Sequence, residues 1–202
     1  MLAVFQYPKD APVKTFLAVF FSLLFSSSIL AADLATGVNA YDNGDYDTAA
    51  QHIPELAKQG DATAQLYLGN MYEYGQGVAE NIETAAQWYT ASAEQGNPSG
   101  QSYLGDMYLS GTGVPQDTQV AIKWYTLAAE QGDSMAQLNL GSIYQNGDGV
   151  EPDAAKAYLW YSIAEANGED SGELEDLASS LSAEQLTAAK QQATDWLAKH
   201  PH

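Results

Sequence analysis

The segment 62–97 arranges its apolar and polar positions with a helical period. Over 62–74 the apolar residues recur at steps of three and four and no proline intervenes, as one buried face of an α-helix requires. Residues 75–78, Gly-Gln-Gly-Val, interrupt the pattern, and glycine commonly ends a helix with a left-handed backbone. A second periodic stretch covers 82–95, with Asn81 placed to cap its first turn. The pattern therefore predicts a pair of antiparallel helices.

This arrangement recurs three times at a pitch of 36 residues. Each first helix carries a Leu-Gly pair and each second helix a Trp-Tyr pair, namely Leu68-Gly69, Leu104-Gly105 and Leu140-Gly141, then Trp88-Tyr89, Trp124-Tyr125 and Trp160-Tyr161. The cap position keeps the same register, as Asp45, Asn81, Asp117 and Asp153. Such self-similarity is typical of stacked repeats, in which no unit buries its apolar face without a neighbour. A molecule of this kind offers a long surface rather than a closed catalytic pocket.

Three of the repeated glycines, Gly69, Gly105 and Gly141, fall inside the predicted first helices. Glycine in a helix interior costs about 1 kcal/mol relative to alanine, so its recurrence needs a reason. We expect the second helix, which carries Trp88, Trp124 or Trp160, to cross close to the first at this point. A hinge role for these glycines is the alternative.

The balance of charge excludes several partners. The 202 residues include 26 acidic and 7 basic side chains, which gives a formal net charge of −19. All seven basic side chains are lysines. Phosphate backbones and anionic lipid surfaces are bound mainly through Lys and Arg, so nucleic acid and an anionic membrane are poor partners. The charge permits attraction to a basic protein or peptide, although such a surplus also serves solubility alone.

Little in the chain suggests catalysis. There is no cysteine, which excludes disulfides, thiolate zinc sites and thiol nucleophiles. The sequence contains no Ser, His and Asp residues in the order of a serine-hydrolase triad, no phosphate-binding loop and no metalloprotease motif. The turn 146–153 gathers carboxylates in a way that suits calcium, but the sister turns 75–78 and 111–114 have the same shape without that charge. We read it as a turn followed by a helix cap, and we predict no catalytic residue, metal or cofactor.

Residues 1–32 differ from the repeats and read as an export signal. Lys9 and Lys14 precede an apolar stretch over 15–30, and Ala31-Ala32 follow it; this is the order of a secretory signal peptide. The small residue usually found three positions before the cleavage site is missing, so an uncleaved N-terminal anchor is the alternative. Either reading places the remaining chain outside the cytoplasm, in the periplasm or in the medium.

The repeated unit resembles the Sel1-like repeat, a relative of the tetratricopeptide repeat. The best copy carries Leu104-Gly105-Asp106-Met107-Tyr108, then Gly111-Thr-Gly113-Val114, Asp117, Ala121, Trp124-Tyr125 and Ala128-Ala129-Glu130-Gln131-Gly132. The resemblance implies an all-α fold, an α/α solenoid of stacked helix hairpins. We expect the signal at 1–32, a tetratricopeptide-like capping hairpin at 33–61, repeats at 62–97, 98–133 and 134–169, and C-terminal capping helices with a tail at 170–202.

The resemblance also implies that first helices line the inner, concave curve. There, positions that vary between repeats form a stripe rich in Tyr, Asn and Asp, whose candidates for protein binding are Tyr67, Asn70, Tyr74, Tyr103, Asp106, Asn139 and Ser142. Tyrosine supplies a large contact area at a low cost in side-chain entropy, which suits a peptide groove. The alternative is that Tyr67 and Tyr103 simply pack against the next repeat.

The family resemblance implies a non-enzymatic scaffold that binds a segment or helix of another protein on this concave face. Two alternatives stay open. One is an enzyme-like activity on peptidoglycan, for which carboxylates of neighbouring first helices should converge and one should titrate abnormally. The other is a secreted factor that engages a host protein.

Overall fold

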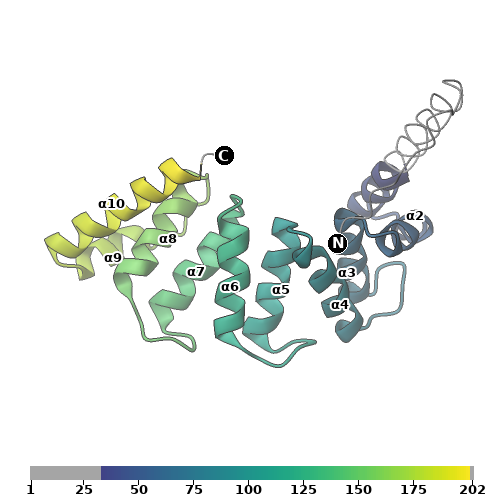
Figure 1. Ribbon diagram of the computed structural model, residues 1–202, viewed down its shortest axis with the longest axis horizontal. Helices are drawn as coiled ribbons and strands as arrows, with labels where there is room; N and C mark the ends of the chain where they lie inside the picture. Colours follow the sequence, from purple (N-terminus) through teal and green to yellow (C-terminus); the bar gives the residue numbers. More distant parts are fainter. Residues whose placement is uncertain (1–32, 201–202) are drawn as a thin grey trace, which may run out of the picture.

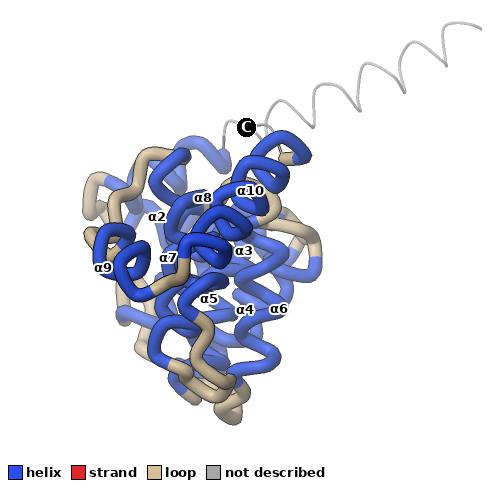
Figure 2. Tube along the Cα trace, turned by 90° about the vertical axis from the view of Figure 1, so that its left-hand side faces the viewer, coloured by secondary structure: helices blue, strands red, loops and turns tan. Residues whose placement is uncertain are grey.

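The computed structural model describes residues 33–200, which form helices and connecting loops without a strand. Figure 1 shows the helices following one another along the long axis of the molecule, and Figure 2 shows the same stack viewed from the end at which α9 and α10 lie. The all-α solenoid expected from the repeats is therefore confirmed. The export signal expected at 1–32 lies outside the described residues.

The helix bounds follow the sequence pattern closely. Residues 33–42 are helical and pair with the next helix to make the first hairpin. The remaining helices are α2 Tyr46–Lys58, α3 Ala62–Tyr74, α4 Ile82–Glu94, α5 Pro98–Ser110, α6 Thr118–Ala129, α7 Ser134–Asn146, α8 Ala154–Ala166, α9 Leu174–Ser180 and α10 Ala183–Lys199. Helices α3, α5 and α7 are the first helices of the three repeats, and α4, α6 and α8 are the second helices.

Side-chain caps begin the helices as the register predicts. Asp45, Asn81, Asp117 and Asp153 each accept a hydrogen bond from the backbone amide three residues on, which satisfies a donor that the first turn leaves free. At the opposite ends, Gly75, Gly111 and Gly147 close the first helices in the left-handed conformation. A capping box of Ser182 and Gln185 begins α10.

The helical glycines mark close helix crossings. A Cβ atom on Gly69, Gly105 or Gly141 would lie 2.5–2.7 Å from the ring of Tyr89, Tyr125 or Tyr161, respectively. The predicted crossing is confirmed, and the side chain that fills it is the tyrosine of each Trp-Tyr pair. The preceding tryptophans, Trp88, Trp124 and Trp160, are half-buried and pack against the core clusters.

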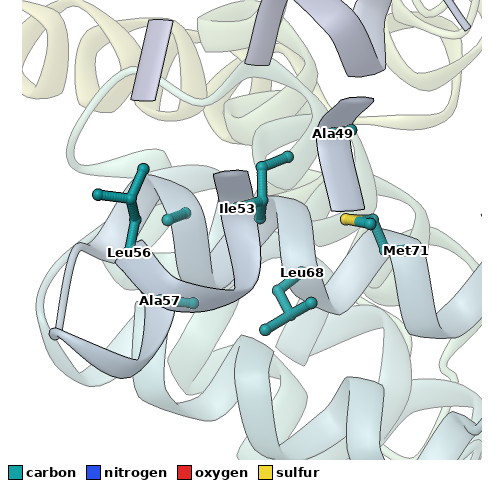
Figure 3. Close-up of a cluster of buried hydrophobic side chains, with 7 residues drawn as sticks. Ala49, Ile53, Leu56, Ala57, Leu68 and Met71 are labelled. Atoms are coloured by element: carbon teal, nitrogen blue, oxygen red, sulfur yellow. The ribbon is translucent and has the colours of Figure 1, made fainter. Parts of the chain in front are cut away.

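Apolar side chains fill the space between neighbouring hairpins. Figure 3 shows the first cluster, in which Ile53 and Leu56 of α2 pack with Leu68 and Met71 of α3. Two equivalent clusters follow along the stack. A fourth joins α8 to the C-terminal helices through Tyr158, Leu177 and Ala189, among others. The hydrophobic contacts therefore hold the hairpins in a continuous row.

Buried glutamines provide a polar link at each junction between hairpins. Gln137 is fully buried in α7, donates to the Ala129 carbonyl at 3.2 Å and accepts from the Asn167 side chain at 3.0 Å. Gln65 and Gln101 make the corresponding bonds in the two earlier repeats. Each glutamine thus ties the end of the preceding hairpin to the end of the second helix in its own hairpin. Since both halves of the amide are paired, this buried group costs little.

Candidate functional site

A pocket of about 330 Å³ opens between the first helices α5 and α7. It is lined by Ser99, Ser102, Tyr103, Asp106, Asp133, Met135 and Asn139. Three of the residues expected on the binding stripe, Tyr103, Asp106 and Asn139, are therefore brought together. We call the surface formed by the seven stripe residues and this pocket the first-helix face.

Asp106 is held in place by two hydrogen bonds. The Tyr125 hydroxyl, which reaches past Gly105, donates to Asp106 Oδ1 at 2.5 Å. Asn139 Nδ2 of the next repeat donates to the same oxygen at 3.0 Å. Within residues 33–200, no hydrogen bond reaches Asp106 Oδ2. The carboxylate is consequently oriented by the fold through one of its two oxygens.

The pKa of Asp106 is raised above its ordinary value. The main cause is the loss of hydration in the pocket, and the hydrogen bonds from Tyr125 and Asn139 oppose it. The negative charges of Glu73 and Asp133 raise this pKa further. A cation entering the pocket would relieve this repulsion.

Tyr103 lies at the junction of the first two repeats. Its ring stacks on Tyr89 with the ring centroids 5.1 Å apart and an angle of 7° between the planes. The Tyr89 hydroxyl lies 2.5 Å from both Asn70 Oδ1 and Glu73 Oε2 and donates to this pair. Tyr103 and Asn70 thus support the packing of the repeats, and Tyr103 also forms a wall of the pocket.

The other predicted residues are spread along the face. Tyr67 packs edge-on against Tyr41 and donates to Asp42 Oδ1 at 3.3 Å, so its partners come from the preceding hairpin and not from the next repeat. Tyr74 is 56% exposed at the end of α3. Ser142 accepts a hydrogen bond from Asn146 and does not line the pocket.

Sequence reasoning missed four residues that line the pocket. Ser99, Ser102 and Met135 stand one helical turn before Tyr103, Asp106 and Asn139, and Asp133 is the N-cap of α7. Residues four apart in a helix share a face, so extending the stripe back by one turn would have found the first three. Met135 is 57% exposed, which makes it the most accessible apolar side chain of the pocket.

Two carboxylates, Asp106 and Asp133, are among the residues that line the pocket, and none of these lining residues is a lysine or a histidine. In the described part of the chain the ion pairs are His52–Asp33 and Lys156–Asp153, and neither lies at the pocket. Over residues 33–200, no group of three or more His, Asp or Glu side chains is placed to hold a metal ion, and no helix is both long and apolar enough to cross a membrane. Chemically, the pocket offers hydrogen-bond acceptors beside an aromatic and a thioether side chain.

Comparison with known proteins agrees with this architecture. The chain resembles the crystal structure of a Sel1 repeat protein from Oxalobacter formigenes, with 30% identity and a TM-score of 0.70, over 82% of this chain and 72% of that one. It also resembles c5321, a protective antigen present in uropathogenic Escherichia coli strains displaying an SLR fold, with 32% identity and a TM-score of 0.51, over 76% of this chain and 41% of that one. Among curated proteins, the search found no match.

The family model of the Sel1 repeat matches residues 62–97, 98–133 and 134–169, one after the other. Proteins with this repeat generally serve as non-enzymatic scaffolds for interactions between proteins. Three consecutive matches and the two solved structures lead to one conclusion: the chain belongs to the Sel1 repeat family.

Proposed function

We propose that this protein is an exported scaffold that binds an extended segment or a helix of another protein along its first-helix face. The observation that carries the proposal is the pocket between α5 and α7, where side chains of two repeats meet. Tyr74 of α3 and Met135 of α7 add exposed apolar area to the first-helix face, and such side chains are enriched where proteins bind one another. The order of residues in 1–32 supports export to the periplasm or the medium.

Affinity capture tests this proposal. The full-length chain, tagged at its C-terminus, is used as bait in envelope and culture-medium extracts, beside a variant with Tyr74→Ala and Met135→Ala. Both residues are more than half exposed, so the variant should fold normally, which circular dichroism checks. Leu127→Ala is the matched control, because Leu127 is 44% exposed on the second helix α6.

The proposal expects a discrete protein that the wild type and the Leu127 variant retain and the double variant loses. Equal retention by all three baits would show that the first-helix face is not the binding surface. No retained protein in either extract would remove the support for a scaffold. Fractionation of the culture, carried out alongside, separates a periplasmic protein from a secreted one.

A second candidate function has one observation in its favour. The carboxylates of Asp106 on α5 and of Asp133 at the N-cap of α7 both line the pocket, and the pKa of Asp106 is raised chiefly by loss of hydration, as acid–base catalysis on peptidoglycan would require. The scaffold remains the preferred function because Asp106 Oδ1 and Asp133 Oδ1 already serve structural hydrogen bonds. Release of soluble fragments from purified peptidoglycan by the wild type, and not by Asp106→Asn, would reverse this preference.

A further inference from the structure

We propose that the pocket between α5 and α7 receives an arginine side chain of the bound partner. This inference rests on the proposed scaffold function and names the chemistry that the first-helix face recognises. Three features carry the inference. Two carboxylates each have an oxygen that accepts no hydrogen bond from residues 33–200, and an aromatic side chain forms one wall of the pocket. The third feature is that the equivalent positions one repeat earlier are not charged.

The carboxylates suit a guanidinium group. Asp106 Oδ1 accepts from Tyr125 and Asn139, and Asp133 Oδ1 accepts from the Ala136 amide at the start of α7. Over residues 33–200, neither Oδ2 atom accepts a hydrogen bond, although both residues line the pocket. Arginine presents several donors in a rigid plane and bonds to carboxylates more specifically than lysine does.

The walls suit the rest of an arginine side chain. Tyr103 offers an aromatic surface, on which a guanidinium plane stacks favourably. Met135 is a flexible apolar side chain at the rim, 57% exposed, and such side chains adapt to the stem of a ligand. The pocket volume of about 330 Å³ accommodates one long side chain.

The electrostatic field at the pocket favours a cation. The pKa of Tyr103 is raised first by burial and then by the charges of Glu73, Asp106 and Asp133, so carboxylates on α3, on α5 and at the N-cap of α7 act on this side chain. Lysine is absent from the residues that line the pocket. A guanidinium group would neutralise charge that the fold itself leaves uncompensated.

The charged pair belongs to this junction alone among the equivalent positions. One repeat earlier, 36 residues before, Asn70 replaces Asp106 and Asn97 replaces Asp133. Asn70 still accepts from Tyr89, and Asn97 still caps its helix through the Gly100 amide. The cap of α7 therefore needs only an amide oxygen, so the charge of Asp133 is additional to its structural role. At the tyrosine hydroxyl of the earlier repeat, Asn70 shares the donor with the Glu73 carboxylate, so an amide oxygen can stand at the position of Asp106.

This equivalence supplies a variant that keeps the fold. Asp106→Asn with Asp133→Asn copies the preceding repeat at both positions and removes the charge. The matched control is Asp117→Asn with Asp153→Asn, which copies Asn81 at the caps of α6 and α8 and removes the same charge outside the pocket.

The test is a titration of the ¹⁵N-labelled full chain, followed by nuclear magnetic resonance, with N-acetyl-arginine amide as the probe. N-acetyl-citrulline amide, which has nearly the same shape without the charge, is the comparison probe. We expect saturable shifts at Ser102, Tyr103 and Asn139, at least tenfold weaker binding of the citrulline probe, and a similar loss for the Asp106/Asp133 variant. The Asp117/Asp153 variant should bind like the wild type.

Three results would overturn the inference: no saturable shift at the pocket, equal binding of the two probes, or an equal loss in the control variant, which would indicate attraction by bulk charge only. The outcome is independent of the capture experiment, because the probe needs no partner. If the Asp106/Asp133 variant still captured the partner that the Tyr74/Met135 variant loses, the scaffold would stand and the arginine site would be wrong.

Discussion

The substitution Gly105→Ala should destabilise the protein although it improves helix propensity. A Cβ atom at this position would lie 2.7, 2.8 and 3.0 Å from three ring atoms of Tyr125. The ring is fully buried and its hydroxyl is bonded to Asp106, so it cannot turn aside. Helices α5 and α6 would have to separate locally to restore ordinary van der Waals distances.

Two opposing effects set the magnitude. Alanine is favoured over glycine in a helix interior by about 1 kcal/mol. Overpacking a tight core costs roughly 1–3 kcal/mol, and three short contacts with a fixed ring place Gly105 near the upper end of that range. The expected net loss in the free energy of unfolding is about 1–2 kcal/mol. In a chain of this size that corresponds to a decrease in Tm of roughly 2–8 °C.

Urea unfolding followed by circular dichroism measures the effect, and a double-mutant cycle assigns its cause. When Tyr125→Ala removes the ring, the same Gly105→Ala change should become stabilising by up to about 1 kcal/mol, because propensity alone remains. Stabilisation by Gly105→Ala in the wild-type background would refute the reasoning. If Gly105→Ala still lowered the free energy of unfolding in the Tyr125→Ala background, the ring would not be the obstacle.

Three further predictions concern stability. The raised pKa of Asp106 means that the folded state binds the carboxyl proton more tightly than the unfolded state does, so ionisation lowers the stability as pH rises through the interval between the two pKa values. Asp106→Asn should therefore be more stable than the wild type at pH 7, and this difference should fade below about pH 4. Equal urea midpoints of the two proteins at pH 7 would contradict this prediction. Gln137→Leu should lower the free energy of unfolding by about 1–3 kcal/mol, since it leaves the Asn167 amide and the Ala129 carbonyl without their side-chain partner; wild-type stability would show that the link contributes nothing. Asp117→Ala should cost about 1 kcal/mol and Asp117→Asn much less, because only the alanine variant loses the acceptor for the Val120 amide; thermal unfolding of both variants separates the cap from the charge.

The sequence was sufficient for the helices because each boundary is local. Asn81 and Gly75 act on the turns next to them, so their repetition predicted where α3 ends and α4 begins. The crossing at Gly69 was predictable from the cost of glycine in a helix. Its partner ring was not, because Trp88 and Tyr89 are neighbours and only the rotation of α4 about its axis selects Tyr89.

The candidate site was predictable only in part because it joins two hairpins. Tyr103 and Asp106 share a helix face through their spacing, whereas Asp133 and Met135 meet them only because α5 and α7 both border the pocket. That placement arises from the packing of the hairpins and is not visible in either helix alone. Tyr67 shows the same limit, since its partners Tyr41 and Asp42 come from the first hairpin.

The buried glutamine links have a consequence for how such a chain changes length. Gln65, Gln101 and Gln137 join their hairpins through the same donor and acceptor atoms, so the connection does not depend on which hairpins are joined. A 36-residue unit could be inserted, deleted or exchanged with every joint intact. The same glutamine hydrogen bonds can thus connect any two hairpins of this kind, and the exposed positions between the junctions are free to diversify one repeat at a time.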